Sequence, residues 1–178
     1  THVSNVFGMI LPVADIAETC RETETPLIVD ASQSAGVLPV DLSGWGAAFV
    51  ALPGHKGLYG PQGTGLLLCG GEGAKPLLYG GTGSMSRLQD MPPDLPDRLE
   101  AGTHNMPGIA GLLEGIRFVR RQGVDAIAAR ERRVAQRAAQ GLERLPGVRI
   151  FWDRELRHQT GVVSFVTEGR NCEEVGED

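Results

Sequence analysis

Two short apolar runs, each ending at a polar segment, constrain the fold of this chain more than any other feature. Residues 27–29 (LIV) stop at Asp30, and residues 45–52 stop at the segment PGHKG, residues 53–57. Continuous β-rich runs with two apolar faces are typical of parallel strands covered by helices. Ligands of open α/β sheets bind beyond the carboxyl ends of such strands. The sequence therefore predicts an α/β fold with a polar site where the two runs end.

Periodicity divides the rest of the chain into the elements of two α/β units. Helical spacing of apolar residues covers residues 13–22, 106–122 and 124–145, and strand patterns cover residues 65–69, 148–152 and 162–166. Residues 3–7 are expected to form a further strand, followed by a turn, and a last helix is expected to begin near residue 172. We predict a domain boundary that separates residues 1–122 from residues 123–178.

Composition and charge exclude several classes of protein. The 178 residues are 41% hydrophobic and 22% charged, as in globular proteins. The net charge of −5 and the lack of a dense basic patch argue against binding to nucleic acid. The basic cluster at residues 130–133 contains Glu131 and is expected to be a solvated helix face. No apolar run approaches the roughly 20 residues that span a membrane, so no membrane partner is predicted.

The cysteines and histidines predict neither a disulfide framework nor a metal site. Cys20, Cys69 and Cys172 are odd in number and far apart, which is typical of free thiols in a reducing compartment such as the cytoplasm. Cys20 and Cys69 are expected to lie in the core, and none of the three is expected to be a nucleophile. The four histidines lack ligand spacing. Both ends of the chain look cut, so we expect a fragment of a longer protein or an incompletely represented chain.

The polar residues beyond the two runs suit pyridoxal phosphate. A desolvated lysine such as Lys56 can act as a nucleophile or a base, and the cofactor aldehyde forms a Schiff base with lysine. The cofactor also needs an acid that keeps its pyridine nitrogen protonated. Asp30, expected to be buried at its strand end, suits this need, and Gln33 is close enough in sequence to contact the same ligand. Taken alone, a strand-end Asp is usually a helix cap or turn former, and a lone His or Lys is usually a solvated loop residue. It is the order in which Asp30, His55 and Lys56 follow the two strands that favours a site. A Walker phosphate loop does not fit, because Lys56 precedes the glycines instead of following them.

Four motifs occur along the chain in the order of one enzyme family: VSNVFG, VDASQSAGVLPVDL, GHKGLYGPQGTG and LEAGTHN. Over nearly its whole length the chain resembles the class V aminotransferase family of pyridoxal phosphate enzymes, and within it the cysteine desulfurase and selenocysteine lyase branch. The resemblance implies the fold of fold-type I transferases. Residues 1–122 would be the C-terminal part of the large cofactor-binding domain, with a parallel-rich sheet. Residues 123–178 would begin a small α+β domain.

The resemblance also implies a role for each residue that matches a motif of the family. Lys56 matches the Schiff-base lysine, and His55 matches the histidine that contacts the cofactor phosphate. Asp30 matches the acid that pairs with the pyridine nitrogen. Gln33 and Asn5 match the residues that hydrogen-bond the side of the ring that carries the hydroxyl.

Thr103 matches the threonine that reaches the phosphate of a neighbouring subunit. The resemblance therefore implies a homodimer with shared active sites, in which the glycine-rich stretch before Thr103 packs on the partner. Gly80, Gly81, Thr82 and Ser84 are expected to line the same shared mouth.

Two departures from the family pattern stand out. Pro53 occupies a position where the family often has a serine or threonine whose hydroxyl holds the phosphate. The family's phosphate-cradling turn and ring-stacking histidine would precede this chain, and its reactive cysteine and substrate-binding arginine would follow it.

The resemblance implies an enzyme that removes sulfur from L-cysteine, giving alanine and an enzyme-bound persulfide for a sulfur-acceptor protein. Three alternatives remain open: a selenocysteine lyase, another aminotransferase or lyase of the family, or a catalytically incompetent structural piece.

Overall fold

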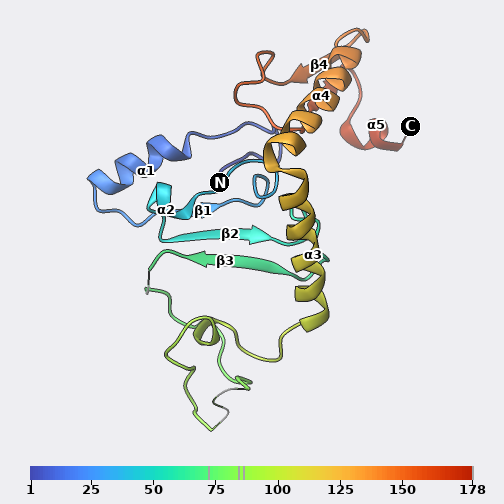
Figure 1. The fold of residues 1–178 in the computed structure, drawn as a ribbon. Helices are drawn as coiled ribbons and strands as arrows, with labels where there is room; N and C mark the ends of the chain where they lie inside the picture. Colours follow the sequence, from blue (N-terminus) through green and yellow to red (C-terminus); the bar gives the residue numbers. More distant parts are fainter. Residues whose placement is uncertain (72, 84, 86, 178) are drawn as a thin grey trace.

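The structure, a computed structural model, describes residues 1–71, 73–83, 85 and 87–177. Its larger sheet has the strand order β1-β2-β3, with β1 (Ile28–Asp30), β2 (Phe49–Pro53) and β3 (Gly65–Cys69). β1 is parallel to β2, and β3 is antiparallel to it (Figure 1). The described part of this sheet is therefore mixed, and its two parallel strands end at the same edge.

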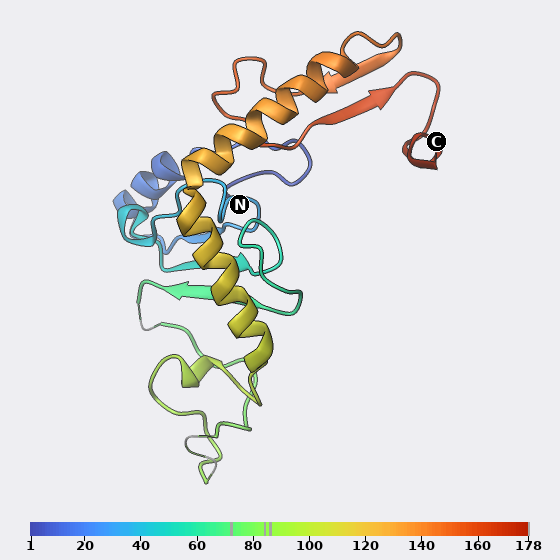
Figure 2. The ribbon, with the colours of Figure 1, turned by 45° about the vertical axis from the view of Figure 1, so that its right-hand side comes forward.

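Three helices agree closely with the sequence periodicity, namely α1 (Val13–Glu22), α3 (Met106–Gln122) and α4 (Val124–Leu142), and α5 (Cys172–Glu177) begins where the last helix was expected. The single turn α2 (Leu42–Trp45) and the 3₁₀ turn η1 (Asp97–Leu99) were not predicted. The Asn105 side chain caps α3 by accepting a hydrogen bond from the Gly108 backbone N–H at 3.1 Å. Gly123, with φ of 83°, separates α3 from α4, and the two helices meet there at an angle (Figures 1 and 2). α4 ends three residues before the predicted end at 145.

The core of the sheet forms between β1, β2 and two helices. Val29, Val50 and Leu52 pack with Val13 of α1 and Leu112 of α3. The prediction that the first run is buried on both faces was wrong, since only the middle residue of β1 is buried. β1 is an edge strand, and Ile28 is 65% exposed on it.

Cys20 and Cys69 are likewise only half-buried, so the expectation that both lie in the core was wrong. Cys20 lies on α1, of which only Val13 and Ala17 are buried, and Cys69 ends β3, the other edge strand. Their positions at the margins of the core explain the partial exposure.

A second, two-stranded antiparallel sheet joins β4 (Val148–Phe151) and β5 (Ser164–Thr167). The N-terminal segment reaches this unit: Met9 forms an antiparallel bridge with Gln159, and the Ile10 N–H donates to the His158 carbonyl at 2.8 Å. The division at residues 122 and 123 stays a prediction, and the start of the chain contacts residues beyond it.

Residues 3–7 do not form the predicted strand. Val3 makes only an isolated bridge with Ile10, and residues 5–7 form a turn. The Ser4 hydroxyl accepts hydrogen bonds from the Val6 and Phe7 N–H groups, which folds the chain back before a strand can extend.

The described residues of the stretch 70–105 extend away from the sheet on the β3 side (Figure 2). It carries strongly exposed apolar side chains, of which Leu77 is the most exposed. Across the part of the chain that the structure describes, no helix combines the length and apolarity needed to cross a membrane.

Candidate active site

The candidate active site lies where β1 and β2 end. Asp30, the last residue of β1, is in register with Ala51 of β2, and β2 ends two residues later at Pro53. The loop after β2 carries His55 and Lys56. Because the strands are parallel neighbours, the loops that follow them meet at one edge of the sheet, as the sequence predicted.

A cleft of about 1010 Å³ opens beside these loops and contains two of the predicted site residues, Gln33 and Lys56. It is lined by the two loops, by Phe118 and Gln122 of α3, by one face of α4 and by residues 160–163. Asn5, Asp30, His55 and Thr103 are not among the described residues that line it. The structure therefore places Gln33 and Lys56 in one cavity and the other four outside its lining.

Backbone contacts between glycines hold the two loops together. A Cβ on Gly36 would lie 1.9 Å from the carbonyl oxygen of Gly57, and a Cβ on Gly57 would lie 2.3 Å from that of Ala35. Gly36 also has a φ of 85°, which L side chains rarely adopt. Glycine at these two positions thus lets the loop that carries Gln33 lie directly on the loop that carries Lys56.

Helix α3 supports the lysine loop from its other side through a stripe of small residues. A Cβ on Gly108 would lie 2.8 Å from Thr64, and a Cβ on Gly115 would lie 2.2 Å from the Leu58 carbonyl. The Gly54 N–H donates to the Thr64 carbonyl at 2.8 Å, which closes the base of the loop. The backbone on both sides of Lys56 is therefore fixed by packing.

The side chains of His55 and Lys56 are exposed, in contrast to the loop backbone around them. Neither side chain has a hydrogen-bond or ion-pair partner among the residues whose positions are described. Lys56 lines the cleft, and its amine, which has no such partner among the described residues, is available to a ligand. Pro53, the unusual residue before this loop, is half-buried and pairs with Gly65 of β3.

Asp30 is an exposed carboxylate, not the buried acid that the sequence predicted. It ends an edge strand, so solvent reaches it. Hydrogen bonds from Ser32 lower the pKa of Asp30, first through the hydroxyl and then through the backbone N–H, which lies 2.9 Å from Oδ1. Partial burial opposes this shift but does not cancel it. Asp30 is therefore an ionised acceptor at neutral pH.

Asn5 lies on an exposed turn, and Thr103 lies in an exposed segment without regular secondary structure. The Gly102 N–H donates to the Gly80 carbonyl at 2.9 Å, and a Cβ on Gly81 would lie 2.7 Å from Gly102 Cα. The segment before Thr103 thus lies beside two of the residues predicted for the shared mouth.

Thr82, predicted for the same mouth, is buried. Ser84, the fourth residue of that prediction, lies outside the described residues. In the described parts of the chain, no group of three or more His, Cys, Asp or Glu side chains could hold a metal ion.

Comparison with known proteins identifies the family. The model of the family described as aminotransferase class-V matches residues 1–177. The chain belongs to the class-V aminotransferase family. This confirms the resemblance that the four motifs carry.

Similar members of this family have one activity in their names. The chain is 36% identical over 174 residues to a probable cysteine desulfurase of Pyrococcus abyssi, covering 92% of this chain and 42% of that protein. It is 35% identical over 188 residues to a probable cysteine desulfurase of Xylella fastidiosa, covering 98% and 42%. The chain thus spans about two fifths of the length of these relatives.

Solved structures support the fold class. The apo structure of a cysteine desulfurase from Thermococcus onnurineus shares 35% identity and a TM-score of 0.86, covering 99% of this chain and 45% of that one. A cysteine desulfurase of Escherichia coli shares 26% identity and a TM-score of 0.82, covering 97% and 43%. The predicted fold-type I transferase fold is confirmed.

Sequence reasoning missed two polar residues in this class-V chain. Glu131, expected on a solvated helix face, lines the cleft on α4, and burial raises its pKa. Gln159 is buried between the N-terminal segment and the β4–β5 unit. Neither residue stands in a motif, and local periodicity offers no signal for a buried glutamine in a polar loop.

Proposed function

We propose that this chain is part of a pyridoxal phosphate-dependent cysteine desulfurase, and that Lys56 carries the cofactor. The observation that supports this most is the placement of Lys56, which lines the same cleft as Gln33 on a loop that follows the strand next to β1, where Asp30 lies. The names of the similar proteins favour cysteine desulfurase over the other activities of the family.

The chemistry of these side chains fits the cofactor. Lys56 offers an aldehyde a primary amine that no described residue pairs with, and Asp30 offers a carboxylate that stays ionised and can hold a proton on a pyridine nitrogen. Gln33 and Asn5 offer amides for the hydroxyl side of the ring, and His55 offers an imidazole for the phosphate. When bound, pyridoxal phosphate supplies a ring that accepts electrons from the carbon next to the substrate amine.

The residues of the chain would then divide the work. The carboxylate of Asp30 keeps the ring nitrogen protonated, and the Nζ of Lys56 takes and returns protons at the substrate once it is free. Gln33 and Asn5 orient the ring, and His55 holds the phosphate end. The close contacts at the glycines around Lys56 would keep its backbone fixed while its Nζ takes and returns protons.

The remaining parts of the proposal concern partners and place. We propose a homodimer in which Thr103 reaches the cofactor phosphate of the partner subunit, since the described residues of the stretch before it extend away from the sheet with exposed apolar side chains. The substrate is L-cysteine, the sulfur passes to an acceptor protein, and the enzyme acts in the cytoplasm, where free thiols persist. Pro53 would leave one phosphate contact to another group.

The decisive experiment replaces Lys56 in the complete gene product. Lys56→Ala should abolish both the visible absorbance of the cofactor-loaded protein and alanine release from L-cysteine. Arg137→Ala, which removes an exposed cation of α4 outside the cleft lining, is the matched control and should change neither. Undiminished colour in Lys56→Ala would show that another group holds the cofactor.

A substrate panel tests the activity itself. Sulfide from L-cysteine in the presence of a thiol is the expected product. Selenide from selenocysteine alone would favour selenocysteine lyase, and a keto acid would favour an aminotransferase. A protein that stays colourless with added pyridoxal phosphate would favour a structural role.

A further inference from the structure

We infer that Gln159 is a positioning residue for Asn5. Gln159, Thr160 and Ser164, which we call the clamp, hydrogen-bond the turn of residues 4–8 that carries the Asn5 side chain. The inference rests on the proposed function, because it assigns Asn5 to the cofactor ring. It adds a second requirement, namely that the unit containing β4 and β5 must hold the turn in place.

Three consecutive carbonyls of the turn accept hydrogen bonds from the clamp. The Ser164 hydroxyl donates to the Val6 carbonyl, and Gln159 Nε2 donates to the Phe7 carbonyl at 2.8 Å. The Gly8 carbonyl accepts from both the backbone N–H and the hydroxyl of Thr160, at 2.9 and 3.1 Å. Every residue between Asn5 and the end of the turn is therefore tied to a segment about 150 residues later in the chain.

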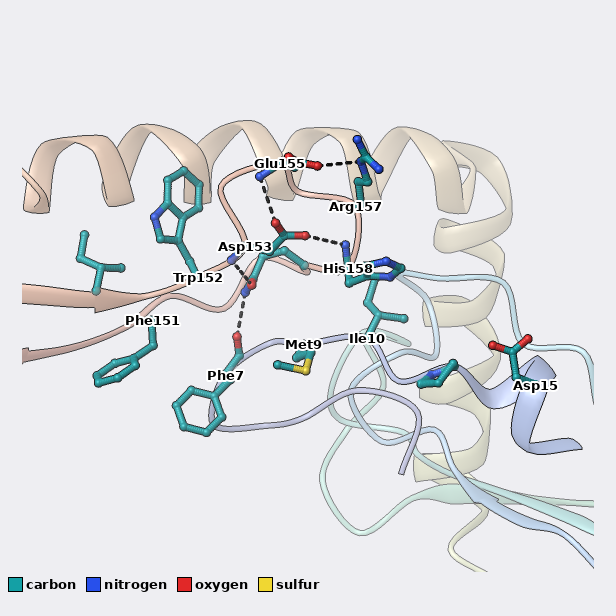
Figure 3. A pocket seen from close by; sticks show the side chains of 13 residues that line it. Phe7, Met9, Ile10, Asp15, Phe151, Trp152, Asp153, Glu155, Arg157 and His158 are labelled. Carbon is teal, nitrogen blue, oxygen red and sulfur yellow. Dashed lines mark hydrogen bonds and ion pairs between the residues drawn. The ribbon is translucent and has the colours of Figure 1, made fainter. Parts of the chain in front are cut away.

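Gln159 uses its whole amide in this clamp. Nε2 also donates to the Val162 carbonyl at 2.7 Å, and Oε1 accepts from the Asp153 N–H at 3.1 Å. The residue is only 2% exposed. Figure 3 draws the hydrogen bonds that lead from Phe7 to Asp153 through this amide, beside a cleft of about 1130 Å³. A buried polar side chain with all these bonds holds its neighbours in one arrangement.

The turn is shaped to accept the clamp. Gly8 has a φ of 66°, and a Cβ there would lie 2.7 Å from Gln159 Nε2 and 2.9 Å from the Val162 carbonyl. Inside the turn, the Ser4 carbonyl accepts from the Gly8 N–H at 2.9 Å. The backbone around Asn5 is thus fixed from within and from the clamp, while its side chain stays exposed for a ligand.

The test measures the clamp and its effect separately, in the complete gene product. Gln159→Ala removes the amide, and Gln159→Glu keeps its shape but cannot donate to two carbonyls when ionised. Both variants should speed amide hydrogen exchange of residues 5–8 in the cofactor-free protein. Gln140→Ala, at an exposed position of α4, is the matched control and should not. Unchanged exchange in both Gln159 variants would refute the clamp.

The second arm asks whether the clamp acts through Asn5. Gln159→Ala should weaken pyridoxal phosphate binding about five- to tenfold, the loss expected for one hydrogen bond. In an Asn5→Ala background the same change should have little further effect, because coupled sites are not additive. Full additivity, or unchanged binding despite faster exchange, would overturn the positioning role. If the wild type binds no pyridoxal phosphate, the proposed function fails, while the exchange arm still decides whether the clamp exists.

Discussion

Replacing Gly115 by alanine tests whether α3 supports the loop that carries Lys56. Gly115 is buried on α3, and Leu58, whose carbonyl it faces, follows Lys56 by two residues. An added Cβ would lie 2.2 Å from that carbonyl and 2.8 Å from the Tyr59 carbonyl carbon. Neither obstacle is a side chain that can rotate away, so Gly115→Ala requires the helix or the loop to move.

Two opposing terms set the magnitude. Replacing glycine by alanine inside a helix stabilises it by about 1 kcal/mol. Overpacking a core typically costs about 1–3 kcal/mol, and a rigid backbone obstacle places this site at about 3. We therefore expect Gly115→Ala to lower the free energy of unfolding by about 2 kcal/mol.

Gly141 provides the matched control. It lies in α4, is exposed, and a Cβ there would meet nothing within 4 Å. Gly141→Ala should therefore keep the helix gain alone and stabilise the protein by roughly 0.5–1 kcal/mol. The two variants should differ by about 3 kcal/mol in urea unfolding of the complete protein.

Pyridoxal phosphate titration of the same samples should show weaker binding in Gly115→Ala only, because its loop carries Lys56. If Gly115→Ala were as stable as Gly141→Ala and bound the cofactor equally well, α3 would not support the lysine loop in the way described.

Two carboxyl groups should show opposite dependence on pH. The pKa of Asp30 lies below its ordinary value, chiefly through Ser32, so its contribution to stability is present above the unfolded pKa and is lost as pH falls through the folded one. Asp30→Asn should therefore be less stable than wild type at pH 6, with the difference shrinking in urea unfolding below about pH 4. Burial raises the pKa of Glu131, so the folded protein holds this proton more tightly and loses stability as pH rises through the raised pKa. Glu131→Gln should be more stable than wild type at pH 7 and nearly equal to it at pH 4; a stabilisation independent of pH would contradict burial as the cause.

Local signals explain why most elements could be predicted. The helix at residues 106–122 is predicted by the spacing of its apolar residues, by Asn105 at its start and by Gly123 at its end. Each of these signals depends only on residues that are near one another in the sequence. The convergence of Asp30 and Lys56 on one edge also follows from sequence, because parallel strands leave no other arrangement.

Contacts between distant segments explain what could not be predicted. The glycines of α3 read in sequence as weak points of a helix, and only the structure shows that Gly115 faces Leu58. The turn around Asn5 reads as a strand because its apolar residues allow one, whereas the Ser4 hydroxyl and the clamp at Gln159 select the turn. The exposure of Asp30 depends on which strand forms the edge of the sheet, which the apolar pattern of one run does not specify.

The backbone of the loop around Lys56 is tightly packed, whereas the Lys56 side chain is exposed, and both properties suit the proposed role. A lysine that binds a cofactor and then moves protons needs a fixed Cα and a free amine. The Cα of Lys56 is fixed by three close approaches that leave no room for a Cβ: Gly57 to Ala35, Gly54 to Thr64 and Gly115 to Leu58. The amine of Lys56 is free in that no described residue forms a hydrogen bond or an ion pair with it. A loop held by side-chain hydrogen bonds could not meet both needs as simply, because the groups that fixed it would compete with the ligand for the amine.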